Sequence, residues 1–341
     1  MRIATYNVEW FSNLFDDAGN LIGGNGWSGR QDVTRAEQTE ALRDVFAKLD
    51  ADAVMVIEAP DIHRGRDGTT ALENFAAYAG IRARKVLAGF SNDTQQEIML
   101  LYDPDQFEVV HDPLGQETGK KGDTDAPRFD STFRIDLDID AAPDLVRWSK
   151  PPLEVAAITK SGNALRLIGV HAKSKAPHGA RGKAEIMRVS IENRRKQLAQ
   201  CIWLRQRVEQ HLSAGDDVIV LGDFNDGPGL DEYEKLFGRS SVEIVMGEDD
   251  AERLFDPHAR MALSQRVGAS PVTSRFKIPP DGRYLSALLD YIMVSRGLLD
   301  KSPKWRIWHP FDDPDCYGDD CLRDALLLAS DHFPVSLDIE I

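Results

Sequence analysis

The chain has 341 residues, of which 42% are hydrophobic, enough for a substantial core in one or two domains. It carries 56 acidic and 41 basic side chains, and its net charge of -15 opposes approach to nucleic acid or to an anionic membrane. A phosphate-bearing substrate would therefore need metal ions or local basic residues to offset that field.

No apolar run reaches the length of a membrane span, and the first residues alternate like a strand instead of forming an export signal. We therefore expect a cytoplasmic protein with no obligate protein partner, with an exported precursor as the alternative. The three cysteines suit neither a disulfide framework nor a zinc site, although Cys316 and Cys321 are close enough in sequence to form a local disulfide.

Short alternating or β-branched runs predict strands along the whole chain. They span residues 2–7, 52–58, 82–88, 97–103, 131–139, 153–159, 164–172, 216–224, 288–295 and 334–341. Helical patterns lie between them at residues 35–49, 72–78 and 185–212, with a further apolar, helix-like run at 325–329.

Gly-rich and polar stretches at residues 16–31, 111–127, 173–183 and 311–321 predict long loops. None has the composition of an interdomain linker, so we expect one domain over residues 1–341. The predicted crossover helices are too few for an all-parallel sheet. The fold class expected is α/β, with two packed, mostly antiparallel sheets flanked by helices in a four-layer αββα sandwich.

Acids, imidazoles and amides recur at the ends of these apolar strands. Such groups are costly to bury unless they are paired, hydrogen-bonded or bound to a metal. Convergence on one rim of the sandwich would satisfy all of them, and hydrolysis of a phosphate ester is the chemistry that these residue types suit. The residues concerned are Asn7, Glu9, Glu58, His171, Asp223, Asn225, Asp290, Asp331 and His332.

Six segments occur in the order typical of one superfamily. They read TYNVEWF, VIEAPD, GVHAKSK, LGDFND, LDYIMVS and SDHFPV, and they run from Asn7 to His332. In these motifs the chain resembles the endonuclease/exonuclease/phosphatase superfamily, which includes pancreatic-type deoxyribonuclease, apurinic endonucleases, sphingomyelinases and inositol phosphatases. TYNVEWF and HAKSK look most like its bacterial predicted-nuclease branch. The resemblance implies a divalent-metal-dependent phosphoesterase.

By this resemblance Glu58 is the principal metal ligand, and Asn7 holds the metal-phosphate end of the site. Glu9 lies where some members have an acid near the metal, and Asp331 is expected to contact the metal or the attacking water. Carboxylate and amide oxygens favour Mg²⁺ or Mn²⁺, with Ca²⁺ as a further choice. A solvated strand residue is the alternative for Glu9.

The resemblance also implies the groups that move protons. His332 is the general base or proton shuttle and is oriented by Asp290. Asp223 and Asn225 position the water and the phosphate, with Asp223 as the alternative base, and His171 stabilises phosphate charge.

Glu97 matches the acid that orients the equivalent of His171 in deoxyribonuclease-like members, although a plain surface acid is the alternative. The loop after His171 supplies candidates for binding substrate phosphates. These are Lys173, Lys175, Arg181 and Lys183.

We therefore expect a phosphodiesterase or nuclease that acts on DNA, RNA or nucleotides by means of an activated water. An enzyme for small or lipid-derived phosphate esters is the alternative within this class, because the acidic charge disfavours long duplexes. A noncatalytic binding module is the alternative outside it.

Overall fold

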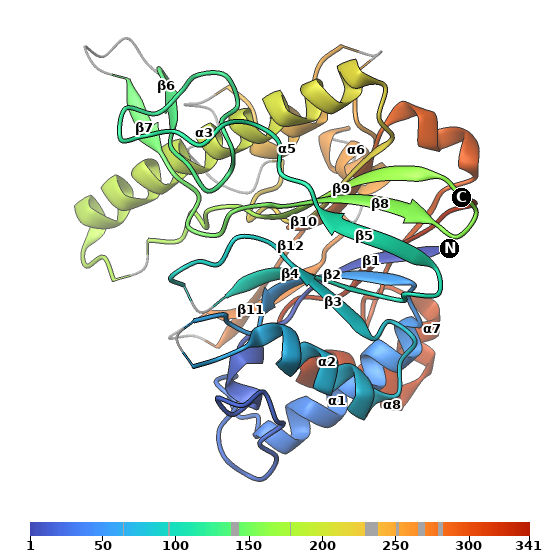
Figure 1. Cartoon of the computed structure of the whole chain (residues 1–341). Helices are drawn as coiled ribbons and strands as arrows, with labels where there is room; N and C mark the ends of the chain where they lie inside the picture. Colours follow the sequence, from blue (N-terminus) through green and yellow to red (C-terminus); the bar gives the residue numbers. More distant parts are fainter. Residues whose placement is uncertain are drawn as a thin grey trace.

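The computed structural model describes residues 1–63, 65–94, 96–137, 143–177, 179–228, 238–249, 252–264, 270–278 and 282–341. Two large sheets lie face to face in the centre of the molecule (Figure 1). The first sheet has the order β14(Lys304–Ile307), β15(Val335–Asp338), β1(Arg2–Asn7), β2(Ala53–Ala59), β4(Glu97–Tyr102) and β3(Lys85–Ala88). The second has the order β13(Asp290–Val294), β10(Val218–Asp223), β9(Ala164–His171), β8(Leu153–Thr159) and β5(Phe107–His111).

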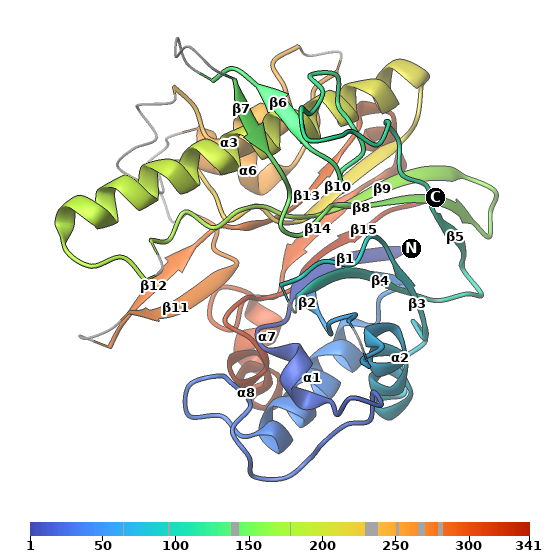
Figure 2. The same ribbon diagram turned by 60° about the vertical axis from the view of Figure 1, so that its left-hand side comes forward.

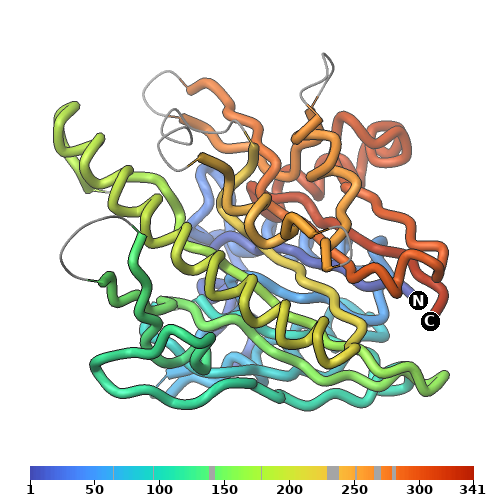
Figure 3. The backbone as a smooth tube through the Cα atoms, turned by 90° about the horizontal axis from the view of Figure 1, so that it is seen from above, coloured from blue at the N-terminus to red at the C-terminus, as the bar shows by residue number. Residues whose placement is uncertain are grey.

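Helices cover the outer face of each sheet (Figure 1). The first sheet is covered by α1(Arg35–Leu49), α2(Gly68–Ala79), α7(Pro314–Gly318) and α8(Asp320–Ala329), and the second by α3(Lys183–Ala214), α5(Ser241–Met246) and α6(Pro257–Leu263). Figure 3 shows α3 running diagonally over the second sheet. The expected four-layer αββα sandwich is confirmed.

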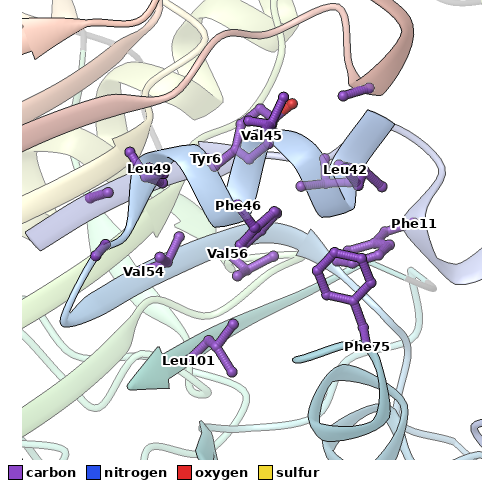
Figure 4. Packing of buried hydrophobic residues seen from close by; sticks show 14 of the residues in the cluster. Tyr6, Phe11, Leu42, Val45, Phe46, Leu49, Val54, Val56, Phe75 and Leu101 are labelled. Carbon is purple, nitrogen blue, oxygen red and sulfur yellow. The ribbon is translucent and has the colours of Figure 1, made fainter. Parts of the chain in front are cut away.

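Three hydrophobic clusters fill the spaces between the four layers. In β1, Ala4 and Tyr6 face the helices while Ile3 faces the other sheet, as the two-residue period of a strand requires. Figure 4 shows the helical side, where Phe46 of α1 packs against Phe75 of α2 with ring centroids 5.2 Å apart. Burying each such side chain contributes roughly 1.5–3 kcal/mol.

The bounds of α1 agree with the sequence because both of its ends carry strong local signals. Thr34 accepts a hydrogen bond from the backbone N–H of Glu37, and the Glu37 side chain accepts one from the backbone N–H of Thr34, which forms a capping box. The helix ends at Leu49, and its C-cap residue Asp50 adopts a left-handed conformation with φ 42°.

The same strand arrangement occurs in both sheets. We call β1–α1–β2 with its antiparallel neighbours β15 and β4 the first half, and β9–α3–β10 with β8 and β13 the second half. In each half two parallel strands are joined by a crossover helix. The carboxyl ends of β1, β2, β9 and β10 and the amino ends of their antiparallel neighbours therefore meet at one edge.

Both chain termini lie at the other end of the sandwich (Figures 1 and 2). They are held there by the Met1 amino group, which donates to Ile339 O at 2.8 Å. No described helix has both the length and the apolar character needed to cross a membrane.

Several local expectations need correction. The loop expected at 311–321 contains α7 and the start of α8, each of which begins after an Asp cap, Asp313 and Asp319. The strand expected at 131–139 shortens to β6(Phe133–Ile135), paired with β7(Asp144–Val146), and residues 138–139 lie outside the described part. The sequence pattern also missed β5, β14 and the hairpin β11(Ser274–Ile278)–β12(Arg283–Ala287). All three cysteines are free, so the optional bond between Cys316 and Cys321 is not formed.

Candidate active site

A cavity of about 1110 Å³ opens at the edge where the strand ends meet. The β11–β12 hairpin and the first turns of α3 project beyond this edge, away from the termini (Figure 2). Most of the residues predicted for the site line the cavity, namely Asn7, Glu9, Glu58, His171, Asp223, Asn225, Asp331 and His332, together with Lys173 and Lys175.

Asp223, the last residue of β10, is held by several hydrogen bonds. Asn7 Nδ2 and Asn225 Nδ2 each donate to Asp223 Oδ2 at 3.0 Å, and the Asn225 backbone N–H donates to Oδ1 at 2.7 Å. Asn225 adopts φ 49°, a left-handed conformation that Asn tolerates better than most residues. Burial raises the pKa of Asp223 to about 7. The two halves thus meet directly through Asn7 and Asp223.

Glu58 lies on a β-bulge in β2, where the register with β4 shifts between Ile57 and Ala59. Its φ of 60° is strained for a residue with a side chain, and bulges of this kind redirect a side chain near the end of a strand. Glu58 Oε2 accepts from Gln96 Nε2 at 2.6 Å. Burial raises the pKa of Glu58 to about 7, so its charged form needs a nearby cation.

His332 and Asp290 form the pair that the sequence predicts. His332 Nδ1 lies 2.7 Å from Asp290 Oδ2, which also accepts from Thr273 Oγ1 at 2.7 Å. The Phe276 ring lies edge-on to the imidazole, with ring centres 5.5 Å apart. Burial disfavours the charged imidazole, but Asp290 together with the charges of Asp223 and Asp331 outweighs it, and the pKa of His332 is raised well above its usual value.

Lys150 is a residue of the site that the sequence reasoning missed. Its Nζ lies 3.3 Å from His171 Nε2, and it lines the cavity. Burial lowers the pKa of Lys150, and burial together with the charge of Lys150 lowers the pKa of His171 well below its usual value. The available signal was its place just before β8, because β8 is antiparallel to β9 and therefore begins at the same rim.

The two remaining acids of the first half lie at the cavity in different settings. Glu9 accepts hydrogen bonds from Arg30 and from Trp10 Nε1, the latter at 3.0 Å. Burial, with the nearby Asp331 charge, raises the pKa of Glu9 to about 7. The backbone carbonyl of Asp331 accepts from the Arg275 N–H at 2.7 Å.

Three residues do not lie where the sequence reasoning expected them. Glu97 accepts from Asn92 Nδ2 at 2.7 Å, while His171 Nδ1 has no hydrogen-bond partner among the described residues, so Glu97 does not orient that ring. Arg181 lies just before α3 and Lys183 is its first residue; both are exposed to solvent and do not line the cavity.

The donors at the rim suit a hard divalent cation. Asn7 Oδ1 is buried and accepts no hydrogen bond from the described residues, and Glu58 offers a carboxylate in the same cavity. No described group of three or more His, Cys, Asp or Glu side chains could hold a metal ion unaided. One carboxylate and one amide oxygen fit Mg²⁺, which usually keeps several of its waters.

A protein-family model matches residues 4–332 of the chain, and its description is the endonuclease/exonuclease/phosphatase family. The chain belongs to this family. It is therefore a phosphoester hydrolase, and enzymes of the family generally use a divalent cation.

The fold of the chain is similar to that of a solved structure, TDP2 from Caenorhabditis elegans. This TDP2 is 14% identical with a TM-score of 0.52, and the match covers 100% of this chain and 75% of that one. A family protein from Bacteroides thetaiotaomicron is 13% identical with a TM-score of 0.49 and coverage of 99% and 96%. A mannosyl-6-phosphatase from the same organism is 14% identical with a TM-score of 0.48, and both chains are covered completely. No curated protein matches the chain in sequence.

Proposed function

We propose that the chain is a divalent-metal-dependent phosphodiesterase that cleaves nucleic acid or nucleotides, with residues 1–341 as one catalytic domain. The observation that supports this most is the meeting, in one cavity, of the oxygen donors of Asn7 and Glu58 with a hydrogen-bonded carboxylate and imidazoles. Hydrolysis of a phosphodiester requires both sets of groups. A cation held by the oxygen donors would neutralise the charge of the ester, and the carboxylate and imidazoles would orient a water.

Glu58 and Asn7 would hold the cation, with Asp331 next to it. Bound Mg²⁺ or Mn²⁺ would polarise a phosphoryl oxygen and offset the charge that develops there. The buried, unpartnered Asn7 Oδ1 supports this assignment, as does the elevated pKa of the Glu58 carboxyl.

The other side chains act on the water and the phosphate. Asp290 fixes the His332 ring through Nδ1, which leaves Nε2 as the atom that exchanges a proton with the reacting groups. Asp223 and Asn225 would orient the attacking water and the phosphate. His171 and Lys150 would stabilise charge on the phosphoryl oxygens.

The neighbouring loop would hold the rest of the substrate. Lys173 and Lys175 line the cavity, where Lys175 pairs with the buried Asp226, and they would supply local positive charge that helps an acidic chain to attract a phosphate. Because the overall charge is -15, hydrolysis of a small phosphate ester is the second candidate function.

Hydrolysis assays on a panel of substrates test this proposal. We would compare duplex DNA, single-stranded DNA, RNA, bis-p-nitrophenyl phosphate and p-nitrophenyl phosphate, each with Mg²⁺, Mn²⁺, Ca²⁺ or chelator, for the wild type and His332→Ala. We expect metal-dependent cleavage of nucleic acid that weakens steeply with added salt. Cleavage confined to the two small nitrophenyl esters would favour the second candidate, and activity that survives complete chelation would contradict the metal-dependent mechanism.

A further inference from the structure

A buried glutamine on α3 contacts both reactive loops of the second half. Gln197 is 0% exposed, and its Nε2 lies 2.9 Å from Lys173 O, 3.1 Å from Phe224 O and 3.0 Å from Asn225 O. The amide has two N–H groups, so at least one of them is shared between two carbonyls. The first carbonyl follows β9 and its His171, and the other two lie in the turn that carries Asp223 and Asn225.

A second buried glutamine occupies the equivalent helix of the first half. Gln38 of α1 is also 0% exposed, and its Nε2 donates to Glu9 O at 2.7 Å and to Ala329 O at 3.0 Å. The first carbonyl lies in the loop after β1 and its Asn7. The second lies directly before the segment that carries Asp331 and His332.

Loops at strand ends leave the ladder of the sheet, so their buried carbonyls need donors from elsewhere. In both halves the donor is a carboxamide on the helix that joins the two parallel strands. We infer that Gln38 and Gln197 are matched positioning residues, each of which ties together two loops that carry reactive side chains of its half; in the first half these are the loops after β1 and before β15, and not the end of β2 that carries Glu58. Their effect on catalysis rests on the hydrolysis proposed above, whereas the ties themselves do not.

The two ties differ in how firmly the glutamine itself is held. Gln197 Oε1 accepts from Arg194 Nη1 at 2.8 Å and from Ser241 Oγ at 3.3 Å, and Arg194 in turn binds the buried Asp226. Gln38 Oε1 has no hydrogen-bond partner in the described part of the chain. The tie made by Gln197 is therefore more rigid than the tie made by Gln38, and losing it should have the larger effect.

Methionine substitutions remove each amide while keeping the length of the side chain. Hydrogen exchange followed by mass spectrometry would compare Gln38→Met and Gln197→Met with Gln206→Met. Gln206 is a matched control on α3 because its Oε1 accepts from the Ala126 N–H, outside the cavity. The peptides to follow contain Val8, Glu9 and His332 for the first half, and Ala172, Phe224 and Asn225 for the second.

We expect Gln197→Met to speed exchange about 10- to 100-fold in the second-half peptides only, and Gln38→Met to speed it less and in the first-half peptides only. In active protein, kcat should fall about 10-fold or more while KM changes little, because the loops hold reactive groups. Gln206→Met should change neither.

Faster exchange throughout the protein in all three variants, or unchanged exchange in the loop peptides, would overturn the inference and leave both glutamines as ordinary core residues. If the wild type hydrolyses no phosphoester, the proposed function fails. The exchange experiment still tests the ties in that case, so the two failures are distinguishable.

Discussion

In the first half of the site the unit β1–α1–β2 ends in an amide and a carboxylate, Asn7 and Glu58, whereas in the second the equivalent unit β9–α3–β10 ends in His171 and Asp223. The basic side chain of Lys150 also lies in the second half. One scaffold therefore supports an oxygen-rich end suited to a cation and an end suited to hydrogen bonding with a phosphate. The difference lies in the residues at the strand ends, because a backbone arrangement alone does not determine the chemistry.

His332 and Asp290 form a second contact between the halves, besides that of Asn7 with Asp223. His332 comes from the loop before β15 in the first sheet, and its partner Asp290 begins β13 in the second. Breaking this pair should have the largest effect of the changes below, since it removes proton transfer and a link between the halves at once.

We expect His332→Ala to lower kcat about 10²- to 10⁴-fold, the range typical of a lost proton-transfer group. Asp290→Asn should also lower kcat, because the ring loses the group that fixes its tautomer. The double variant should be no slower than His332→Ala alone, as steady-state kinetics on a cleavable ester can measure. Additive losses would show that the two residues act independently.

Lys150→Met tests the basic side of the second half. The loss of a charged donor beside His171 should lower kcat/KM about 10²-fold, the lower end of the effect of removing one such group. Lys160→Met is the matched control, because Lys160 is exposed after the far end of β8. Equal kinetics for the two variants would remove Lys150 from the site.

Comparing Glu9→Gln with Glu58→Gln shows which of these two acids of the first half binds the cation. Glu9 already binds Arg30 and Trp10, so its loss should change the half-saturating Mn²⁺ concentration less than about fivefold. Glu58→Gln should raise that concentration more than about 100-fold. Removing even a group that only hydrogen-bonds to a metal ligand lowers metal affinity about 10- to 100-fold, and Glu58 would be a ligand itself. Similar shifts in both variants would make Glu9 a ligand as well.

Asp256 provides a pH test in the second half that concerns stability alone. This buried carboxyl accepts from the backbone N–H groups of Ala259 and Ile292, at 2.8 Å and 3.0 Å, and burial raises its pKa to about 6. The folded state therefore binds this proton more tightly than the unfolded chain, so stability falls as pH rises from about 4 to about 6.

Asp256→Asn should remove up to about 3 kcal/mol of that pH dependence, an order-of-magnitude figure from the difference between the folded and unfolded pKa values. Chemical denaturation of both proteins from pH 4 to pH 8 measures it. Parallel curves for the two proteins would contradict the elevated pKa.

Much of this site follows from the sequence because its groups end strands. Two parallel strands joined by a crossover helix place their carboxyl ends at the same edge of a sheet, so Asn7 falls beside Glu58 and His171 beside Asp223 once the two crossover units are recognised. The order of the six motifs indicated the endonuclease/exonuclease/phosphatase family, and the match of the family model confirms it.

The missed features depend on long-range packing instead. Lys150 precedes β8 and lies at the cavity only because β8 runs antiparallel to β9. Glu97 begins β4 at the same edge, but its carboxylate accepts a hydrogen bond from Asn92 and does not contact His171. The buried positions of Gln38 and Gln197 give no sequence signal, because a glutamine on a helix is usually solvated.

The central claim is that the first half holds the cation, whereas His332 transfers a proton. It is tested most directly by measuring Mn²⁺ binding by calorimetry for the wild type, Glu58→Gln and His332→Ala. Hydrolysis would be measured on the same samples. The structure predicts that Glu58→Gln loses both binding and hydrolysis, whereas His332→Ala binds Mn²⁺ about as well as wild type and hydrolyses little. Unchanged Mn²⁺ binding by Glu58→Gln would contradict the cation site of the first half.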